Sequence, residues 1–353
     1  AGRGGRVPDS LIECLPGDTL DVGPFTVQWL PITHSTPDTC ALHIRCRAGS
    51  VLHTADWKID ATPVVGPAFD AGAFESAGAT ELDAVICDST NATVAGHSVS
   101  EGDVRRGLRE VVGKAEGRVV VACFASNVAR LASLAWVAER SGRYLGLLGR
   151  SLQTIHSAAL TTRLVSRSER LIAPEHLGYL PRQEVLAVAT GSQGEPGAAL
   201  ARLAAGSHPA MELEAGDTLI LSARVIPGNE DLVQRLLDRF RERGVRIVDA
   251  DSVSAPVHAS GHPCADELAA MYTWLRPRLA VPVHGEPRHM QENARIARAS
   301  GARLALTGSN GDLFYLAPEP GIRRRAASVG RLQVDDDGSL APAQPPTDPA
   351  NAR

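Results

Sequence analysis

Between residues 94 and 255 the sequence repeats one pattern, in which an apolar run leads into a polar or glycine-containing loop and then into a helix-like stretch. Residues 119–123 form such a run, 125–127 are its loop, and a helical pattern covers 128–140. An apolar run also leads into a polar loop at 144–151, at 185–196 and at 218–230, and helical patterns follow the last two of these loops. Alternating units of this kind predict a mostly parallel sheet covered by helices. Because ligands of such sheets bind at the carboxyl ends of the strands, we expect a binding edge along these loops.

Shorter strands precede this region. Residues 19–29 alternate apolar and polar side chains around a Gly-Pro turn and predict a hairpin. A second hairpin is predicted at 41–56, and a further strand at 83–87. Histidine or aspartate recurs where an apolar strand stops, at His34, His53, Asp56 and Asp88.

Two later turns carry three more imidazoles. The first is HASGH at 258–262 and the second is PVHGE at 282–286, with a short helix predicted at 266–274 between them. Imidazoles on turns at the ends of elements suit metal binding or proton transfer better than core packing.

A site that mixes imidazole and carboxylate ligands suits Zn²⁺ or Mn²⁺. The residues that qualify are His34, His53, Asp56, Asp88, His258, His262 and His284. Their spacing is not a local metal motif such as HExxH, and a lone histidine is more often an ordinary surface or core residue. Asp88 has three readings, as a general acid, a metal ligand or a helix cap.

Three loops of the alternating region present groups that bind phosphate. Ser126-Asn127, Arg150-Ser151 and the loop around Ser192-Gln193 offer hydroxyls, amides, a guanidinium and backbone N–H groups. Ordinary N-capping explains each loop about equally well. Three such loops on one sheet edge favour an extended polyanion.

Composition excludes several classes. The chain has 353 residues, 44% apolar and 22% charged, and no apolar run long enough to cross a membrane. A net charge of −4 argues against a broadly basic nucleic-acid coat but leaves room for a local basic groove. The six cysteines form no CxxC pair, which predicts free thiols in a reducing cytoplasm. The first residues show no signal peptide, and we expect a cytoplasmic location.

Taken together, these stretches resemble the ribonuclease J family, whose metallo-β-lactamase fold carries an inserted β-CASP domain. The matching stretches follow one another in the family's order over roughly residues 17 to 316. They are HSTPD (34–38), HTADWKID (53–60), DSTNA (88–92), FASN (124–127), GRS (149–151), TGSQGEP (190–196), IPGNE (226–230), HASGHP (258–263), PVHGE (282–286) and NGD (310–312).

The resemblance implies an α/β protein with an αββα sandwich. It assigns residues 1–93 and 256–318 to the metallo-β-lactamase domain and 94–255 to the β-CASP domain. Residues 319–353 are expected to form a linker or disordered tail.

Roles are also implied. His34, Asp56 and His284 match metal ligands of a two-ion Zn or Mn centre, in which Asp56 bridges the ions. Asp88 matches the proton donor, and His262 its acid–base partner at the scissile phosphate. Asp312, in the NGD turn, is implied as a ligand of a structural cation such as Ca²⁺.

The resemblance further implies how RNA is bound. The segment His258, Ala259, Ser260, Gly261 and His262 grips a substrate phosphate, since a hydroxyl and a flexible glycine let donors approach an oxyanion closely. Ser126, Asn127, Arg150, Ser151, Ser192 and Gln193 line the RNA channel and a pocket for a 5′ monophosphate.

The implied activity is that of a metal-dependent ribonuclease, acting as a 5′→3′ exonuclease and as an endonuclease on single-stranded RNA in rRNA processing and mRNA decay. A homodimer or dimer of dimers is the family's assembly. A non-catalytic RNA-binding paralogue is one alternative. A small-molecule metallo-hydrolase is another, but it would not need three phosphate-binding loops.

The chain departs from the family pattern at three places. The HxHxDH motif, which supplies four residues of the metal centre, does not occur in residues 1–353, and Ala55 and Ala259 stand where glycine and valine are usual. The family's small C-terminal domain is also not recognised. We expect a truncated chain of an active enzyme rather than a degenerate paralogue. We also expect an incomplete metal site, and weak or absent nuclease activity, in residues 1–353.

Overall fold

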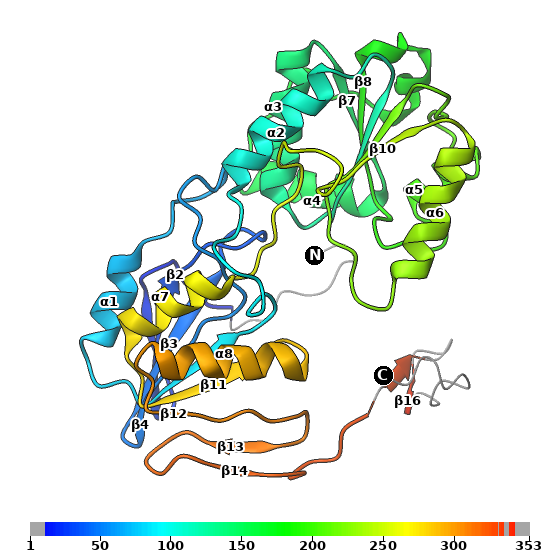
Figure 1. Ribbon diagram of the computed structural model, residues 1–353. Helices are drawn as coiled ribbons and strands as arrows, with labels where there is room; N and C mark the ends of the chain where they lie inside the picture. The colour runs from blue at the N-terminus through cyan, green and yellow to red at the C-terminus, as the bar shows by residue number, and fades with distance from the viewer. Residues whose placement is uncertain (1–10, 331, 335–338, 343–353) are drawn as a thin grey trace.

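The computed structural model describes residues 11–330, 332–334 and 339–342, and it contains two α/β units (Figure 1). The first unit comprises the segments before residue 99 and after residue 262, and we call it the hydrolase unit. The second lies between them and is called the inserted unit. Among the described residues, no helix is both long enough and apolar enough to cross a membrane.

The hydrolase unit is built on a seven-stranded sheet in the order β1-β2-β3-β4-β5-β11-β12. The strands β1 to β4 are antiparallel neighbours, so both expected hairpins are confirmed. From β4 onward the neighbouring strands run parallel. The strands are Thr19–Val22, Phe25–Pro31, Cys40–Cys46, Gly49–His53, Ala84–Asp88, Leu279–Val283 and Leu304–Ala305.

The two faces of this sheet are covered differently. The helices α1 (Ala71–Gly78), α7 (Ala265–Leu275) and α8 (Pro287–Ala299) cover one face, where Trp57, Phe74 and Tyr272 are fully buried. A smaller cluster on the other face includes Phe314 of β13 (Leu313–Tyr315), which pairs with β14 (Gly321–Arg323).

The inserted unit has the parallel sheet that the sequence predicts. Its five strands lie in the order β10-β9-β6-β8-β7, and every neighbouring pair is parallel. Separate apolar clusters fill its two faces. The strands are Val119–Ala122 (β6), Tyr144–Leu148 (β7), Val185–Ala189 (β8), Thr218–Leu221 (β9) and Arg246–Val248 (β10). The helices are Glu101–Gly113 (α2), Val128–Ser141 (α3), Arg150–Thr161 (α4), Pro174–Tyr179 (η1), Arg182–Glu184 (η2), Ala199–Ala204 (α5) and Glu230–Glu242 (α6).

Two boundaries differ from expectation. Val257 and Ala259 pack in the apolar core of the inserted unit, so that unit extends beyond residue 255. The expected disordered tail was wrong at Gly321–Arg323, because these residues pair with β13. Short strands also occur at Leu332–Val334 (β15) and Leu340–Pro342 (β16). Positions 331, 335–338 and 343–353 of the expected tail lie outside the described residues.

A chain of buried charges joins the two units. In the hydrolase unit, the Lys58 ammonium lies 3.1 Å from the Asp60 carboxylate, which accepts a hydrogen bond from the Glu101 N–H of the inserted unit. Glu101 pairs with Arg130 at 3.0 Å, and Arg130 donates to the carbonyl of Ser222 at 2.9 Å. Each of the four charged side chains is 2% exposed or less. Sequence reasoning did not identify this network.

We predict that Glu101→Gln destabilises the protein by about 3–5 kcal/mol, because it leaves the buried Arg130 without its counter-charge. Urea unfolding at pH 7 measures the effect. The matched control is Glu110→Gln, which removes an exposed helical pair with Lys114 and should cost less than about 0.5 kcal/mol. Equal effects of the two substitutions would contradict the prediction.

The same carboxylate should contribute to acid sensitivity. Burial alone raises the pKa of Glu101, but the charge and hydrogen bonds of Arg130 outweigh it and bring the pKa below its usual value. A lowered folded-state pKa stabilises the protein above the ordinary carboxyl pKa of about 4.3, and this stability is lost as the pH falls through the lower folded value. The stability gap between wild type and Glu101→Gln should therefore shrink on acidification.

Candidate active site

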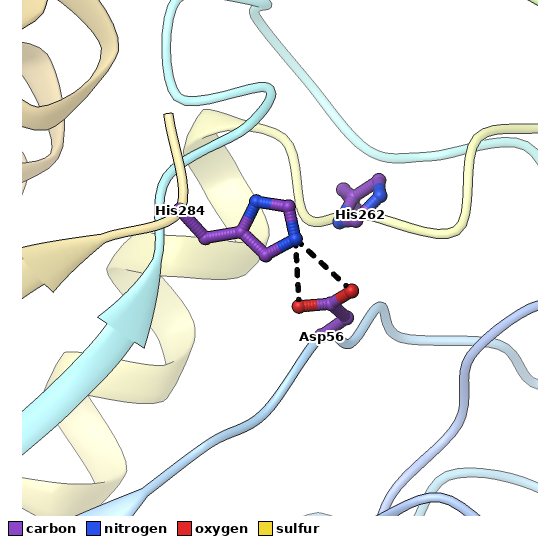
Figure 2. Close-up of side chains that lie close together, drawn as sticks. All are labelled: Asp56, His262 and His284. Atoms are coloured by element: carbon purple, nitrogen blue, oxygen red, sulfur yellow. Dashed lines mark hydrogen bonds and ion pairs between the residues drawn. The ribbon is translucent and has the colours of Figure 1, made fainter. Parts of the chain in front are cut away.

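Three side chains bring their ligand atoms within 4.8 Å of one another: Asp56, His262 and His284 (Figure 2). The parallel strands explain two of them, because β4, β5 and β11 are neighbours and their carboxyl ends meet at one edge. Asp56 follows β4 and His284 follows β11, whereas His262 comes from the segment before α7. The structure thus brings together three residues that the sequence singled out.

The pair of Asp56 and His284 sits on strained backbone. His284 Nε2 lies 3.1 Å from the Asp56 carboxylate. Both His284 and Ala55, the residue before Asp56, have a φ of 55°, in the left-handed region that favours glycine. Non-glycine residues in this region cost roughly 1–2 kcal/mol each. Such strain clusters at functional sites, where the surrounding structure holds the side chain in place.

We predict that Ala55→Gly raises the free energy of unfolding by about 0.5–1 kcal/mol, since glycine adopts the left-handed conformation without a Cβ clash. Urea unfolding measures the change. Ala158→Gly, in the exposed face of α4, is the control and should lower stability by about 1 kcal/mol. A loss of stability in Ala55→Gly would show that the alanine is not strained.

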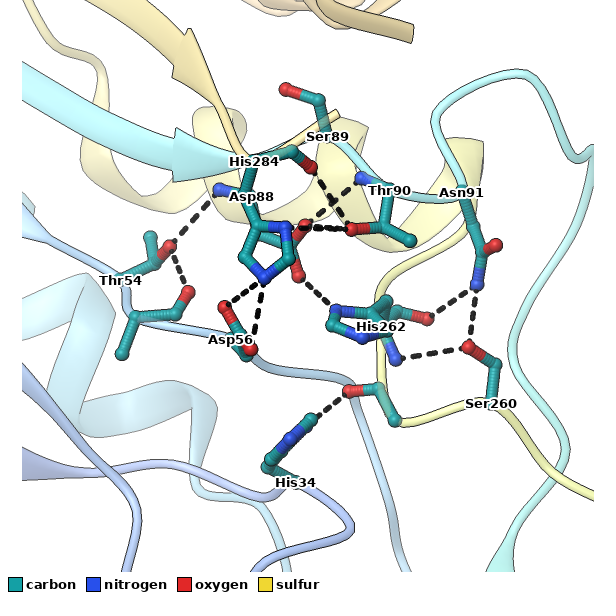
Figure 3. A network of polar contacts seen from close by, with 12 residues as sticks. His34, Thr54, Asp56, Asp88, Ser89, Thr90, Asn91, Ser260, His262 and His284 are labelled. Atoms are coloured by element: carbon teal, nitrogen blue, oxygen red, sulfur yellow. Dashed lines mark hydrogen bonds and ion pairs between the residues drawn. The ribbon is translucent and has the colours of Figure 1, made fainter. Parts of the chain in front are cut away.

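The half-buried His262 and the buried Asp88 form a hydrogen-bonded pair. His262 Nδ1 lies 2.7 Å from Asp88 Oδ2, and the Thr90 N–H and hydroxyl donate to Oδ1 at 2.9 and 2.8 Å (Figure 3). Burial opposes the charged form of each partner, but their mutual attraction outweighs it. The pKa of Asp88 is therefore lowered and that of His262 raised. Asp88 holds the proton on Nδ1, which leaves Nε2 as the free nitrogen of His262.

His34 lies beside this cluster. Its Nδ1 donates to the carbonyl of Gly261 at 2.7 Å, and its ring centroid is 5.3 Å from that of His262. Burial lowers the pKa of His34, which favours the neutral imidazole that binds metals. A Cβ on Gly261 would lie 2.6 Å from His34 Cε1, so glycine is required for this close approach.

The donor set fits a divalent transition metal. One carboxylate with two or three imidazoles is an arrangement that Zn²⁺ and Mn²⁺ accept. A metal-binding histidine usually donates its other N–H to a carboxylate or a backbone carbonyl. The Gly261 carbonyl accepts such a hydrogen bond from His34, and the Asp88 carboxylate accepts one from His262, the acid–base candidate beside the ligands.

The segment 258–262, which was expected to bind a substrate phosphate, contains both half-buried and core residues. The Ser260 hydroxyl accepts hydrogen bonds from the His262 N–H at 3.2 Å and from the Asn91 amide at 2.8 Å. His258 points elsewhere, because both ring nitrogens are buried and neither makes a hydrogen bond of normal geometry. Burial, reinforced by the charge of Arg130, lowers the pKa of His258 to about 4. Ala259 belongs to the apolar core of the inserted unit.

The expected RNA-binding loops occupy the carboxyl edge of the inserted sheet, but several of their residues are structural. Asn127 is buried, caps α3 through the Arg130 N–H and donates to Glu101. The Gln193 amide donates to the Arg224 carbonyl and accepts from the Ile226 N–H. Ser192 is also buried, whereas Ser126 is exposed.

Arg150 and Ser151 lie differently, because they line an open pocket of about 860 Å³ at the ends of β7 and β8. Among the described residues, none that lines this pocket is acidic, and Arg202 of α5 adds a second guanidinium. Sequence reasoning missed Arg202. The pocket suits a phosphate group because arginines and hydroxyls are its main polar lining.

The Asp312 carboxylate does not form an open cation site, because protein donors already occupy it. Its carboxylate accepts hydrogen bonds from the Ser309 and Arg325 N–H groups and from the Arg324 guanidinium. These contacts lower the pKa of Asp312 to about 2. A cation at this position would have to displace Arg324.

Sequence reasoning also missed Thr90, Asn91, Asn293 and Arg224. Asn293, on α8, donates to the Asp88 carbonyl at 2.9 Å and to the Ser89 hydroxyl at 3.0 Å. Thr90 and Asn91 lie within the quoted DSTNA motif, which was the available signal for them. Asn293 and Arg224 lie far along the chain and had no comparable signal.

The sheet, its inserted parallel unit and the cluster at the strand ends define a metallo-β-lactamase fold with an inserted β-CASP domain. Two family models match the chain. "Ribonuclease J, beta-CASP domain" covers residues 116–240, and "Zn-dependent metallo-hydrolase RNA specificity domain" covers 252–304. The chain belongs to the ribonuclease J family.

Three relatives show the extent of the match. Ribonuclease J of Sinorhizobium meliloti is 41% identical over 90% of this chain and 56% of its own length. Ribonuclease J of Thermus thermophilus is 36% identical over 93% and 58% respectively, and ribonuclease J2 of Bacillus subtilis is 31% identical over 86% and 53%. The chain thus spans a little over half the length of these relatives. A solved structure of a protein of unknown function from Enterococcus faecalis shares the fold, with a TM-score of 0.61 at 15% identity over 90% of this chain and 68% of the other.

Proposed function

We propose that the protein is a metal-dependent ribonuclease that hydrolyses phosphodiester bonds of single-stranded RNA. It acts as a 5′→3′ exonuclease with endonuclease activity in rRNA processing and mRNA decay, in the cytoplasm. The observation that carries the proposal is the convergence of Asp56 and His284 with the His262–Asp88 pair beside Ser260. Carboxylate and imidazole ligands next to a proton-transfer pair are what hydrolysis of a phosphodiester requires. The names of the relatives agree with this reading.

Two Zn or Mn ions are the proposed cofactors, and His34, Asp56 and His284 would be among the residues that hold them. Bound there, such ions supply an acidified water and positive charge for the phosphate oxygens. The residues 1–353 contain no HxHxDH motif, so these three side chains are part of the family's ligand set.

The protons are managed by His262. Because the pKa of Asp88 is lowered, its carboxylate stays ionised, orients His262 through Nδ1 and stabilises the imidazolium. The free Nε2 then exchanges a proton with the phosphodiester oxygens. Ser260 and the backbone at Gly261 bind a phosphate oxygen beside it. This division of labour transfers the expected proton-donor role from Asp88 to its partner.

The RNA 5′ end is proposed to bind at the pocket that contains Arg150, Ser151 and Arg202. Two arginines, with no acidic side chain among the described lining residues, favour a doubly charged phosphate monoester. Assembly as a homodimer or dimer of dimers and a structural Ca²⁺ at Asp312 rest on the family resemblance. The contact of Asp312 with Arg324 does not support the Ca²⁺ assignment.

We predict that His262→Ala in the full-length protein lowers the rate of Mn²⁺-dependent RNA hydrolysis by about 10²–10⁴-fold, the usual contribution of a general acid or base. His176→Ala, an exposed histidine of η1, is the control and should leave the rate unchanged. RNA binding without chelator-sensitive cleavage in the wild type would instead favour the non-catalytic RNA-binding alternative.

A second prediction concerns the 5′ end. The full-length protein should degrade 5′-monophosphate RNA faster than 5′-triphosphate RNA, and Arg150→Gln should reduce that ratio by roughly tenfold because one charge-assisted contact is lost. Single-turnover rates on the two substrates measure the ratio. Equal rates in the wild type would rule out the proposed 5′ pocket while leaving the hydrolase assignment intact.

A further inference from the structure

Arg224 links the inserted unit to the candidate active site. It lies in the loop between β9 and α6, and its Nη1 donates to the side-chain oxygen of Asn91 at 2.8 Å. The loop itself is anchored, because the Gln193 amide donates to the Arg224 carbonyl at 3.0 Å and accepts from the Ile226 N–H at 2.8 Å. A cationic donor of one unit is therefore held against a buried amide of the other.

The contacts of Asn91 define which way its amide faces. Its nitrogen donates to the Ser260 hydroxyl at 2.8 Å and to the His262 carbonyl at 3.2 Å (Figure 3). A guanidinium can only donate and a carbonyl can only accept. The Asn91 oxygen must therefore face Arg224, and its NH₂ group must face Ser260. Asn91 is 2% exposed, so loss of Arg224 would leave a buried oxygen without its donor.

This orientation determines what Ser260 can do. A hydroxyl has one proton and two lone pairs. The Ser260 oxygen already accepts from the Asn91 amide and from the His262 N–H. Within the part of the chain that the structure describes, no acceptor engages its proton. The hydroxyl is thus left with one free function, which is to donate to an incoming acceptor.

We propose that Arg224 and Asn91 are positioning residues that make the Ser260 hydroxyl an obligate donor to a phosphate oxygen of RNA. The inference rests on the proposed function, since it assigns Ser260 to substrate phosphate. Neither residue needs to touch the reacting atoms. Because the pair spans the two units, the hydroxyl is oriented only when both units are in place.

The test is a double-mutant cycle on the dissociation constant for a fluorescein-labelled, 5′-monophosphorylated single-stranded oligoribonucleotide, measured by anisotropy in EDTA. Arg224→Met should weaken binding about tenfold when Ser260 is present, because the oriented hydrogen bond to phosphate is lost. In the Ser260→Ala background it should weaken binding only about threefold, the share that comes from the lost positive charge.

Three further variants sharpen the cycle. Arg224→Lys keeps a donor and a charge and should restore most of the affinity. Asn91→Asp keeps the contact with Arg224 but offers Ser260 an acceptor. The loss of RNA affinity that it causes should therefore also be smaller in the Ser260→Ala background. Arg235→Met, an exposed arginine of α6, is the matched charge control and should have the same effect in both backgrounds.

Equal losses for Arg224→Met in both backgrounds would overturn the inference, since Arg224 would then act by charge alone. That result would leave the proposed function standing as long as the wild type binds and cleaves RNA. Failure of the wild type to bind the oligoribonucleotide would count against the proposed function itself. Arg224 is exposed, so its substitution should preserve the fold, and melting curves of the variants test this.

Discussion

The buried chain of charges from Lys58 to Arg130 is the constraint on which the rest of the structure depends. It connects the end of the first sheet to the first helix of the inserted unit, and through the Ser222 carbonyl to the end of β9. The Ser222 hydroxyl then donates to the Val257 carbonyl, where the chain returns to the hydrolase unit. Both crossings between the units are thereby tied to one set of ion pairs. Isolated buried charges are costly, so such a set is stable only when every member has its partner.

The candidate site depends on this junction because its parts come from both sides of the inserted unit. Asp56 and Asp88 precede the insertion, whereas His262 and His284 follow it. The parallel pairing of β5 with β11 places Val283 opposite Asp88, and so brings His284 beside residues nearly two hundred positions earlier. The inserted unit adds Arg224 to the same cluster through Asn91. The geometry of the candidate site therefore depends on the contacts between the two units as well as on the edge of the first sheet.

Much of this arrangement was predictable from the sequence. Alternation of apolar runs, loops and helical stretches predicted the parallel sheet, because hydrophobic period follows directly from which faces are buried. The strand-end rule pointed to Asp56, Asp88 and His284, and these residues do meet or lie beside one another. For His262, the indication was its position in a turn before a predicted helix, where an imidazole suits metal binding or proton transfer. Chain order alone left several roles of each residue open.

Other features were not predictable because they depend on partners distant in the chain. Charged side chains are expected at the surface, yet Lys58 is buried against Asp60, and Glu101 is buried against Arg130. Asn127 and Gln193 were expected at a ligand site, but their amides satisfy nearby backbone and side-chain groups. Short polar side chains bond readily to local backbone, so such motifs support a capping role as well as a binding role. Arg202 was not predictable because it reaches the pocket only through the packing of α5 beside the loop of Arg150.

The pairing of β5 with β11 also sets the order in which the protein can fold during synthesis. The first four strands and β5 are complete before residue 90, but the neighbouring strand β11 begins at Leu279. Contacts between such distant segments form slowly, whereas the inserted unit has its own apolar cores and a continuous stretch of chain. The inserted unit can therefore fold on the ribosome while the first sheet still lacks its inner neighbour. The arrival of β11 closes that sheet and brings His284 to Asp56, so the candidate site is assembled among the last events of folding.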